Sequence, residues 1–263
     1  MLKHAVALTV AGSDSGGGAG IQADIKTFSA CGVYGASVIT AVTAQNLEGV
    51  RAIQAIRPAV VEAQLRAVLE GYPVRAVKTG MLFNRGIIEA VAAVLKEHPG
   101  MPLVVDPVFA ATSGSRLIKP QAIRVLCERL FPLASLVTPN VPEAEFLCSG
   151  SIRSLADLRE AGELLYEHYG VPFLMKGGHL PKNAVDLLLD ERGGKYYQAP
   201  LVRGVNSHGS GCTFSAAITA WLARGRRLRV AVAEAKSYIT LGLAHAHALR
   251  PGTNVIDHFF RRG

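Results

Sequence analysis

Short apolar runs rich in branched side chains alternate with longer amphipathic runs along most of this chain. The pattern predicts strands over residues 5–11, 36–44, 74–79, 102–106, 135–138 and 173–175, and helices over 19–31, 58–71 and 85–97, from about 120 and from 154. Such alternation is typical of an α/β fold with a mostly parallel sheet and helices on both faces. Two further runs, 184–189 and 195–198, flank a glycine-containing turn and predict an antiparallel hairpin at one sheet edge. Two helices are expected to finish the chain.

Length and composition limit the class of protein. A chain of 263 residues with 49% hydrophobic residues can bury a large core, and we expect one domain spanning residues 1–263. The four cysteines are widely spaced and match neither a disulfide framework nor a structural zinc site, which favours a cytoplasmic location. No apolar segment approaches the roughly 20 residues that cross a bilayer, so we expect no membrane association.

The formal net charge of +8 would permit nucleic-acid binding. The basic residues cluster only at 224–229 and 261–262, however, without interleaved aromatic side chains. We interpret these clusters as solvated surface and expect no nucleic-acid partner. The excess positive charge could help to collect anionic substrates.

Unusual residues follow six of the predicted strands. They are Gly12-Ser13-Asp14, Gln45-Asn46, Thr79-Gly80-Met81, Asp106-Pro107, Pro139-Asn140 and Lys176-Gly177-Gly178-His179. In open α/β sheets, ligands bind beyond the carboxyl ends of the strands. The six segments therefore predict one shared cleft.

A glycine-rich turn over 206–212 comes directly before a predicted helix that begins at Thr213. Gly209 and Gly211, on either side of Ser210, allow a left-handed backbone whose amide hydrogens turn toward one concavity. The free N–H groups and positive dipole end of the helix would face the same point, which predicts a site for a phosphate or a phosphoryl group in transfer. An ordinary loop-to-helix turn with a buried Cys212 thiol is the alternative.

Two other glycine-rich segments resemble nucleotide-binding motifs only weakly. Residues 16–23 match the dinucleotide fingerprint in part, but the acidic residue expected after the second strand is missing. A glycine loop closing over a small ligand fits as well, with Asp24 as a partner for a hydroxyl group. Gly193-Gly194-Lys195 lacks the remaining residues of a Walker A loop, so a kinase with this sequence would not be a P-loop kinase.

Taken together, these motifs resemble those of hydroxymethylpyrimidine/phosphomethylpyrimidine kinases of thiamine biosynthesis, within the ribokinase-like superfamily. The motifs are Gly12-Ser13-Asp14, Gly17–Asp24, Gly32-Val33-Tyr34-Gly35, Thr43-Ala44-Gln45-Asn46, Lys78-Thr79-Gly80-Met81, Val105-Asp106-Pro107-Val108, Thr138–Glu145, Lys176-Gly177-Gly178-His179 and the turn over 206–212. The resemblance covers nearly the whole chain. It implies an enzyme that uses ATP and Mg²⁺ twice, first on the hydroxymethyl group of 4-amino-5-hydroxymethyl-2-methylpyrimidine and then on the monophosphate. A homodimer would be typical of the superfamily.

The resemblance implies a substrate-binding set of Gln45, Gly12, Asp24, Met81 and Val108. The Gln45 side chain carries a donor and an acceptor side by side, which matches a ring nitrogen beside an exocyclic amine. We therefore predict that Gln45 reads the pyrimidine. Met81 and Val108 would form apolar walls on the two faces of the ring.

A second set is implied for phosphoryl transfer, which depends mainly on positioning and charge neutralisation. The amides of the turn from Gly209 to Cys212 would hold the γ-phosphoryl group, and Lys176 would supply a positive charge. Asn140 and Glu143, in an N-x-x-E arrangement, resemble the magnesium-organising pair of the superfamily and would act through waters, with help from Asp106.

Cys212 stands where many ribokinase-like enzymes have an aspartate base and where this family has cysteine. A helix N-terminus is expected to lower the pKa of the thiol. Our hypothesis is that Cys212 assists proton removal from the hydroxymethyl group in the first step. The second step needs it less, because a phosphate monoester is already largely dianionic at neutral pH.

Two departures and three alternatives accompany this interpretation. Residues 109–114 lack a lysine that the family usually has before Ser-Gly, and 251–254 replace a His-Gly-Pro-like turn. Some pyridoxal kinases share the glycine loop and the Gly-Ser-Gly-Cys site, so vitamin B6 aldehydes are the nearest rival substrates. A nucleic-acid binder and a nicotinamide oxidoreductase are the remaining alternatives.

Overall fold

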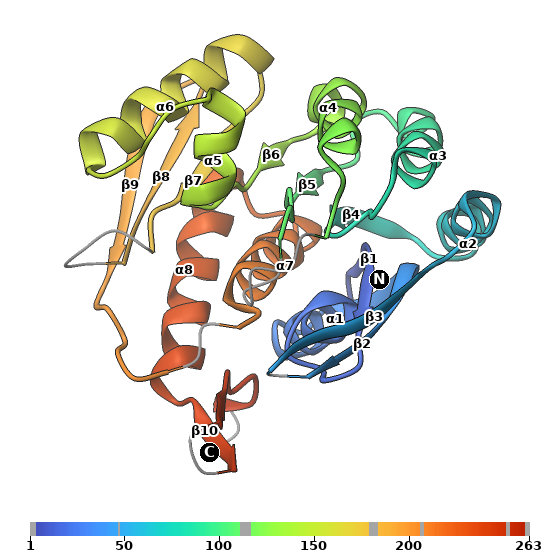
Figure 1. Cartoon of the computed structure of the whole chain (residues 1–263), viewed down its shortest axis with the longest axis horizontal. Coiled ribbons are helices and arrows are strands. Elements are labelled where there is room, and N and C mark those ends of the chain that lie inside the picture. The colour runs from blue at the N-terminus through green and yellow to red at the C-terminus, as the bar shows by residue number, and fades with distance from the viewer. Residues whose placement is uncertain are drawn as a thin grey trace.

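The computed structural model of the chain is shown in Figure 1. It describes residues 4–46, 48–110, 117–178, 184–205, 208–250 and 253–260. The elements in chain order are β1 (Val6–Asp14), α1 (Gly20–Ala30), β2 (Tyr34–Asn46), β3 (Gly49–Ala55), α2 (Pro58–Gly71), β4 (Val74–Thr79), α3 (Arg85–Lys96), β5 (Leu103–Val105), α4 (Pro120–Arg129), the short 3₁₀ helix η1 (Phe131–Leu133), β6 (Leu136–Val137), α5 (Val141–Cys148), α6 (Leu155–Tyr169), β7 (Phe173–Lys176), β8 (Ala184–Asp190), β9 (Gly193–Ala199), α7 (Ser210–Ala223), α8 (Leu228–Ala244), β10 (His247–Arg250) and β11 (Thr253–Val255).

Within the described residues, one nine-stranded sheet runs in the order β3-β2-β1-β4-β5-β6-β7-β8-β9. Its six central strands, from β2 to β7, pair in parallel. β3 pairs antiparallel with β2 at one edge, and β8 and β9 are antiparallel at the other. The predicted mostly parallel α/β sheet with an edge hairpin is confirmed.

Helices cover both faces of the sheet (Figure 1). Successive residues of β1 point to opposite faces: Leu8 belongs to the core under α2, α3, α4 and α6, and Ala7 to the core under α1, α7 and α8. Val61 and Leu65, on α2, are fully buried in the first of these cores. Burial of such side chains contributes about 1.5–3 kcal/mol each. This two-sided burial explains why the parallel strands are continuous apolar runs.

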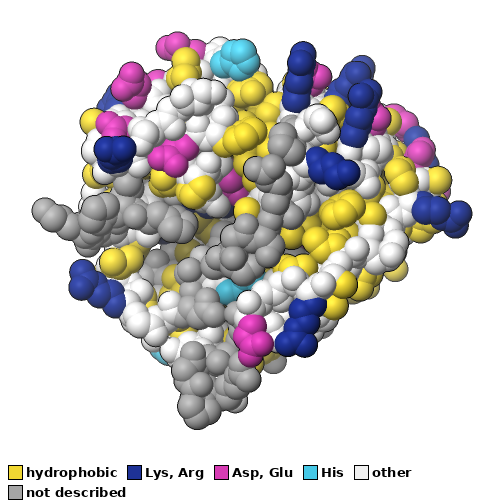
Figure 2. All heavy atoms as spheres, viewed as in Figure 1, with side chains coloured by type: hydrophobic (Ala, Val, Ile, Leu, Met, Phe, Trp, Pro, Cys, Tyr) yellow, Lys and Arg dark blue, Asp and Glu magenta, His cyan; other side chains and the backbone are white. Residues whose placement is uncertain are grey.

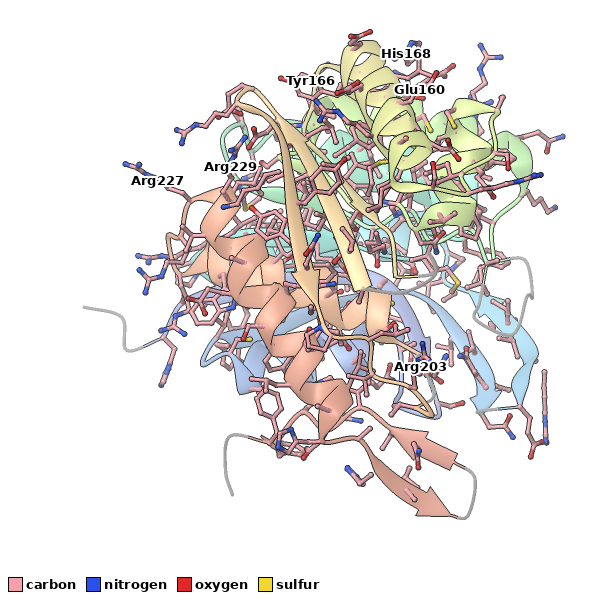
Figure 3. The ribbon with its side chains drawn as sticks, turned by 90° about the vertical axis from the view of Figure 1, so that its left-hand side faces the viewer. Glu160, Tyr166, His168, Arg203, Arg227 and Arg229 are labelled. Atoms are coloured by element: carbon pink, nitrogen blue, oxygen red, sulfur yellow. The ribbon has the colours of Figure 1, made fainter. Side chains whose placement is uncertain are left out.

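The edge hairpin is fixed to α8. Glu191 and Arg192 alone connect β8 to β9, a tighter turn than the five-residue loop that the sequence suggested. Asp190 accepts a hydrogen bond from Arg229 at the start of α8, with 2.8 Å between Nε and Oδ2. Figure 3 shows Arg229 at this end of α8, beside the hairpin.

β2 and β3 differ from the prediction for this part of the chain. β2 extends to Asn46, so Gln45 lies within the strand rather than after it. β3 was not predicted at all. Its Arg51 and Gln54 are exposed at the sheet edge, so the segment lacks the apolar run by which a buried strand is recognised.

The end of the chain also differs. β10 and β11 form a two-stranded antiparallel sheet after α8, so the prediction that two helices finish the chain was wrong. β10 extends away from the rest of the chain at the bottom of Figure 1. The unpredicted helix α5 is short, with Asn140 as its N-cap and a proline in its first turn. Among the described residues, no helix combines the length and apolar character that crossing a membrane requires.

Candidate active site

A cavity of about 730 Å³ lies at the carboxyl ends of the parallel strands. Each of the six segments that follow or end a predicted strand contributes to its wall, through Gly12, Ser13, Asp14, Gln45, Gly80, Met81, Asp106, Asn140, Lys176 and Gly178. The predicted shared cleft is therefore confirmed. Figure 2 shows this face of the molecule hollowed near its centre. His179, Asn206, Ser207 and most of the two departing segments, 111–114 and 251–252, lie outside the described residues.

The glycine-rich turn forms one wall of the cavity. α7 begins at Ser210, earlier than predicted, with Gly209 as its N-cap at φ +77°. A Cβ at residue 209 would lie 1.8 Å from the carbonyl oxygen of Gly18, so glycine is required there by both conformation and space. Ser210, Gly211 and Cys212 line the cavity in the first turn of α7, where backbone N–H groups have no partner within the helix. The geometry suits an anion.

Asp106 joins β5 to three other elements. Its Oδ1 accepts hydrogen bonds from Lys176 Nζ at 2.8 Å and from Thr138 Oγ1 at 3.0 Å. Its Oδ2 accepts one from Ser215 Oγ on α7 at 2.9 Å. Burial alone would raise the pKa of Asp106, but the charges of Lys176 and Lys78 keep it below its ordinary value. Asp106 therefore remains a carboxylate and holds Lys176 against the cavity wall.

Asn140 and Glu143 form a capping box at the start of α5. Asn140 Oδ1 accepts the N–H of Glu143 at 2.9 Å, and Glu143 Oε2 accepts the N–H of Asn140 at 2.8 Å. Burial raises the pKa of Glu143 to about 7, against the charge of Lys176 and with a further rise from the charge of Asp106. The N-x-x-E spacing thus has a local structural role, and its predicted role in organising magnesium stays a prediction.

The predicted magnesium residues fit a cation that keeps most of its water. Asp106 and Glu143 line the same cavity, and a divalent cation beside them would favour the charged form of Glu143, which burial and, to a lesser extent, the charge of Asp106 disfavour. Within the part of the chain that the structure describes, no group of three or more His, Cys, Asp or Glu side chains could form a complete cage. Mg²⁺ typically binds through one or two carboxylates, waters and substrate phosphates.

Cys212 does not have the lowered pKa that its position at a helix N-terminus predicted. Burial raises the pKa of the thiol to about 11, although the charge of Lys78 opposes the rise. Removing the thiolate from water outweighs the favourable field of α7 and Lys78. The thiol is therefore protonated at neutral pH in this structure.

Asp24 does not line the cavity, contrary to its predicted place in the substrate-binding set. Its side chain is fully buried, accepts a hydrogen bond from Thr9 Oγ1 at 2.6 Å and pairs with Lys78 Nζ at 2.7 Å. Lys78 does line the cavity. Burial alone would lower the pKa of Lys78, but the charges of Asp24, Cys212 and Asp106 raise it. Asp24 keeps Lys78 charged rather than facing a ligand. The sequence signal for such a pair was a lysine inside the otherwise apolar run 74–79.

The remaining substrate-binding candidates line the same cavity as the turn. Gln45, Met81 and Val108 all line it. A Cβ at Gly12 would lie 2.3 Å from Met81 Cε, so glycine leaves room for the Met81 side chain. The structure therefore brings together an amide and two apolar side chains, as the predicted pyrimidine site requires.

Two residues that the prediction quoted but gave no role, Asp14 and His208, connect the glycine loop and the turn over 206–212 to Gln45. Asp14 accepts backbone hydrogen bonds from Gly16 at 2.8 Å, Gly18 at 3.0 Å and Ala19 at 2.8 Å, which orders the glycine loop. His208 Nε2 lies 3.3 Å from Asp14 Oδ2. An aspartate two residues before a glycine run is the sequence signal for such a turn.

The cavity geometry can now be compared with known proteins. The model of the phosphomethylpyrimidine kinase family matches residues 14–257 of this chain. The chain belongs to this family. A hydroxymethylpyrimidine/phosphomethylpyrimidine kinase of Rhizobium meliloti is 46% identical over 261 residues, covering 98% of each chain. The chain spans about half, 51%, of a thiamine biosynthesis bifunctional protein of Geobacter sulfurreducens, to which it is 50% identical.

Solved structures of two kinds resemble this family member. A phosphomethylpyrimidine kinase from Clostridium difficile is 44% identical with a TM-score of 0.79, covering 90% of this chain and 98% of that one. A Bacillus subtilis pyridoxal kinase, solved as an ADP complex, is 35% identical with a TM-score of 0.89, covering 98% and 99%. The fold is thus that of the ribokinase-like kinases.

This phosphomethylpyrimidine kinase family member has a further buried ion pair on the cavity wall that the sequence did not reveal. Lys236 Nζ on α8 lies 2.6 Å from Asp186 Oδ2, and Asp186 Oδ1 accepts the N–H of Gly177 at 3.1 Å. The pair ties α8 to the segment that carries Lys176. The local sequence patterns of residues 184–190 and 228–244 did not indicate that Asp186 and Lys236 form a pair.

Proposed function

We propose that this chain transfers the γ-phosphoryl group of ATP to 4-amino-5-hydroxymethyl-2-methylpyrimidine and then phosphorylates the monophosphate to the diphosphate. The observation that supports this most directly is the single cavity that joins the α7 turn and the Lys176–Asp106 pair to Gln45, Met81 and Val108. The first group of residues can neutralise phosphate charge and the second can bind a flat aminated ring. Membership of the phosphomethylpyrimidine kinase family agrees with both proposed phosphorylations. The names of relatives that are similar over nearly the full chain agree with them as well.

In this proposal Gln45 pairs with a ring nitrogen and the adjacent amine, while Met81 and Val108 pack on the ring faces. Exclusion of water by these apolar walls strengthens the amide hydrogen bonds. The hydroxymethyl group then points toward Cys212 and the turn of α7. Asp24 contributes indirectly, since it keeps Lys78 charged beside the thiol.

The transferred group would be held by the backbone N–H groups of Ser210 to Cys212. These donors are fixed by the helix before the reaction, so they need no reorganisation as charge develops. Lys176, oriented by Asp106, neutralises the phosphate oxygens. Asn140, Glu143 and Asp106 would organise Mg²⁺, which neutralises charge on the phosphates when bound.

Cys212 has a role only in the first step of this proposal. Its minor thiolate form accepts the proton of the hydroxymethyl oxygen as that oxygen attacks phosphorus. A thiolate of raised pKa is scarce at neutral pH but is a stronger base. In the second step the acceptor is a phosphate monoester that is largely deprotonated, so no base is needed.

A second candidate function is favoured by one observation, the close likeness to pyridoxal kinase structures with TM-scores up to 0.89. The sequence identity to these kinases, 35% or 31%, is lower than the 46% shared with the Rhizobium meliloti hydroxymethylpyrimidine/phosphomethylpyrimidine kinase. Cytoplasmic location, a homodimer and the absence of nucleic-acid and membrane partners stay predictions of the sequence.

Mass spectrometry of the reaction products tests the proposal. The protein is incubated with ATP, Mg²⁺ and the hydroxymethylpyrimidine, and in parallel with pyridoxal. We expect the monophosphate to appear first and the diphosphate to follow, with slower or no turnover of pyridoxal. Efficient phosphorylation of pyridoxal without a pyrimidine diphosphate would favour the second function, and no ATP turnover on either substrate would refute both.

A further inference from the structure

The imidazole of His208 contacts two groups through the same nitrogen. His208 Nε2 lies 3.3 Å from Asp14 Oδ2 and 3.4 Å from the amide nitrogen of Gln45. In neutral imidazole a given ring nitrogen either donates or accepts a hydrogen bond. A hydrogen on Nε2 suits Asp14, whereas a lone pair would be needed to accept from an amide nitrogen. Both contacts cannot be hydrogen bonds as they stand.

Asp14 decides which atom carries the hydrogen. Burial would raise its pKa, but the hydrogen bonds from His208 and from the backbone of Gly16 and Ala19 bring the pKa below its ordinary value. The side chain is therefore an ionised carboxylate, which can only accept hydrogen bonds. It follows that His208 Nε2 donates to Asp14 and has no lone pair for Gln45. The same N–H can be shared with an amide oxygen of Gln45 in a three-centre hydrogen bond, because Nε2 lies 3.4 Å from that end of the amide.

The contacts of Thr43, on the other side of the Gln45 amide, also indicate which end of that amide is the nitrogen. Its hydroxyl group has one hydrogen, and Oγ1 lies 2.9 Å from the carbonyl oxygen of Ser13, to which it donates. Oγ1 also lies 3.3 Å from the amide oxygen of Gln45. With that hydrogen already used, an amide nitrogen at the same place would make a hydrogen bond to Oγ1 and an amide oxygen would not.

The two ends of an amide have nearly the same shape, and hydrogen-bond partners decide which is oxygen. Both partners of Gln45 require its oxygen on the His208 side and its nitrogen on the Thr43 side. The place of His208 is itself well defined. Its side chain is 14% exposed, and a Cβ on Gly18 would lie 2.7 Å from its Cδ2, so the ring packs closely on the glycine loop.

We propose that His208, held by Asp14, fixes the polarity of the Gln45 amide and thereby makes the site select an aminopyrimidine over the isosteric oxopyrimidine. The inference rests on the proposed function, in which Gln45 contacts the ring. The second N–H of the amide faces a ring acceptor, and the second lone pair of its oxygen faces an exocyclic amine. His208 is a positioning residue here, since it acts through Gln45.

An oxopyrimidine reverses this pattern, because its ring N–H and carbonyl oxygen exchange the donor and the acceptor. The N–H of Gln45 would then face an N–H, and its oxygen would face an oxygen. Rotating the amide to repair these contacts would break the hydrogen bonds to His208 and Thr43. Sites built around buried hydrogen bonds reject mismatched ligands strongly for this reason.

The test compares kcat/KM for the aminopyrimidine and for the 4-oxo analogue that retains the hydroxymethyl group. The wild-type protein should prefer the amino compound by about 100-fold or more. His208→Phe leaves the amide free to rotate and should reduce this preference to about tenfold or less, chiefly by improving the KM of the oxo compound relative to that of the amino compound. His208→Gln carries an amide nitrogen near the position of Nε2 and should retain the preference.

His168→Phe is the matched control, because His168 lies near the end of α6 and points away from the sheet (Figure 3). It should leave the preference unchanged. An unchanged preference in His208→Phe, with both substrates slowed equally, would overturn the proposal. So would a loss of preference in His168→Phe.

A direct readout in the wild-type protein uses ¹⁵N-labelled histidine and NMR spectroscopy to assign the tautomer of His208. Hydrogen on Nε2 supports the proposal, and a neutral ring with hydrogen on Nδ1 alone overturns it without reference to activity. Gln45→Leu distinguishes a failure of the proposed role of Gln45 from a failure of the proposed role of His208. If it leaves the KM of the aminopyrimidine unchanged, the proposed role of Gln45 and this inference fail together. If Gln45→Leu raises that KM while His208→Phe retains the preference for the aminopyrimidine over the 4-oxo analogue, only the proposed role of His208 fails.

Discussion

Lys78 Nζ lies 2.7 Å from Asp24 Oδ1, and both side chains have no exposed surface. The pair connects β4 to α1 beside the cavity and replaces the ligand contact that Asp24 was predicted to make. A buried charge without its partner is far less stable than a buried pair. Substitutions in this pair are therefore expected to affect both the stability of the fold and the cavity that Lys78 lines.

Removing one partner of this pair should destabilise the fold. Lys78→Met leaves the buried Asp24 carboxyl group without its counter-charge, and we expect a loss of about 3–5 kcal/mol in the free energy of unfolding. The double variant Lys78→Met/Asp24→Leu should recover much of that loss. Urea denaturation measures both. Arg124→Met, which breaks an exposed pair with Glu128, is the control and should change stability little. A double variant no more stable than Lys78→Met would contradict this explanation.

Gly209→Ala should abolish most phosphoryl transfer. The methyl group would require a left-handed alanine and would collide with the Gly18 carbonyl oxygen, 1.8 Å away, so the turn must move. We expect kcat to fall by at least about 100-fold, as for loss of a fixed oxyanion donor. Gly225→Ala has a similar φ of +78° with no atom within 4 Å and is the matched control. Equal activity of the two variants would contradict the proposed role of the Gly209 turn in phosphoryl transfer.

Cys212→Ala should slow phosphorylation of the hydroxymethylpyrimidine far more than that of its monophosphate. Because burial raises the thiol pKa to about 11, the thiolate fraction in the wild-type protein increases with pH throughout the physiological range. The rate of the first step should therefore increase with pH in the wild-type protein and depend on pH less in the variant. Single-turnover assays of each step measure this, and equal losses in both steps would reject the split role.

Gln45→Leu should raise the KM of the pyrimidine by about 10- to 100-fold, because a bidentate amide pair contributes about 1–3 kcal/mol of recognition. The KM of ATP should not change, since in the proposed function Gln45 contacts the pyrimidine ring and not the nucleotide. Gln54→Leu, at an exposed position on β3, is the control. A change in the KM of ATP alone would place Gln45 on the nucleotide side.

Acid should destabilise the protein through His258. Burial lowers the pKa of His258 to about 4 from 6.5, and its Nδ1 lies 3.1 Å from the hydroxyl oxygen of buried Tyr238. The unfolded chain therefore binds a proton that the folded chain does not, so stability is complete above pH 6.5 and falls as the pH drops toward 4. The loss should approach roughly 3 kcal/mol. His258→Gln should remove this component, as measured by urea denaturation between these pH values.

Much of the fold could be predicted because its strands and helices are locally periodic. α6 begins where a helix was predicted, with Ser154 and Asp157 as its capping box, and β8 and β9 form the predicted hairpin. β3 and the β10–β11 pair were missed because short, exposed strands depend on their neighbours rather than on an apolar pattern of their own. The shared cleft was predictable because the carboxyl ends of parallel strands meet at one edge.

The sequence by itself determined the turn before α7, the glycine loop and the alternation of strands and helices, since each follows from properties of residues close together in the chain. Only the tertiary structure decided that Asp24 pairs with Lys78, that the Cys212 thiol is less acidic than its helix position suggests, and that His208 stands between Asp14 and Gln45. These properties depend on burial and on contacts between residues 54 to 194 positions apart. Desolvation and long-range contact leave no periodic signal in a sequence, so they emerge only when the chain is folded.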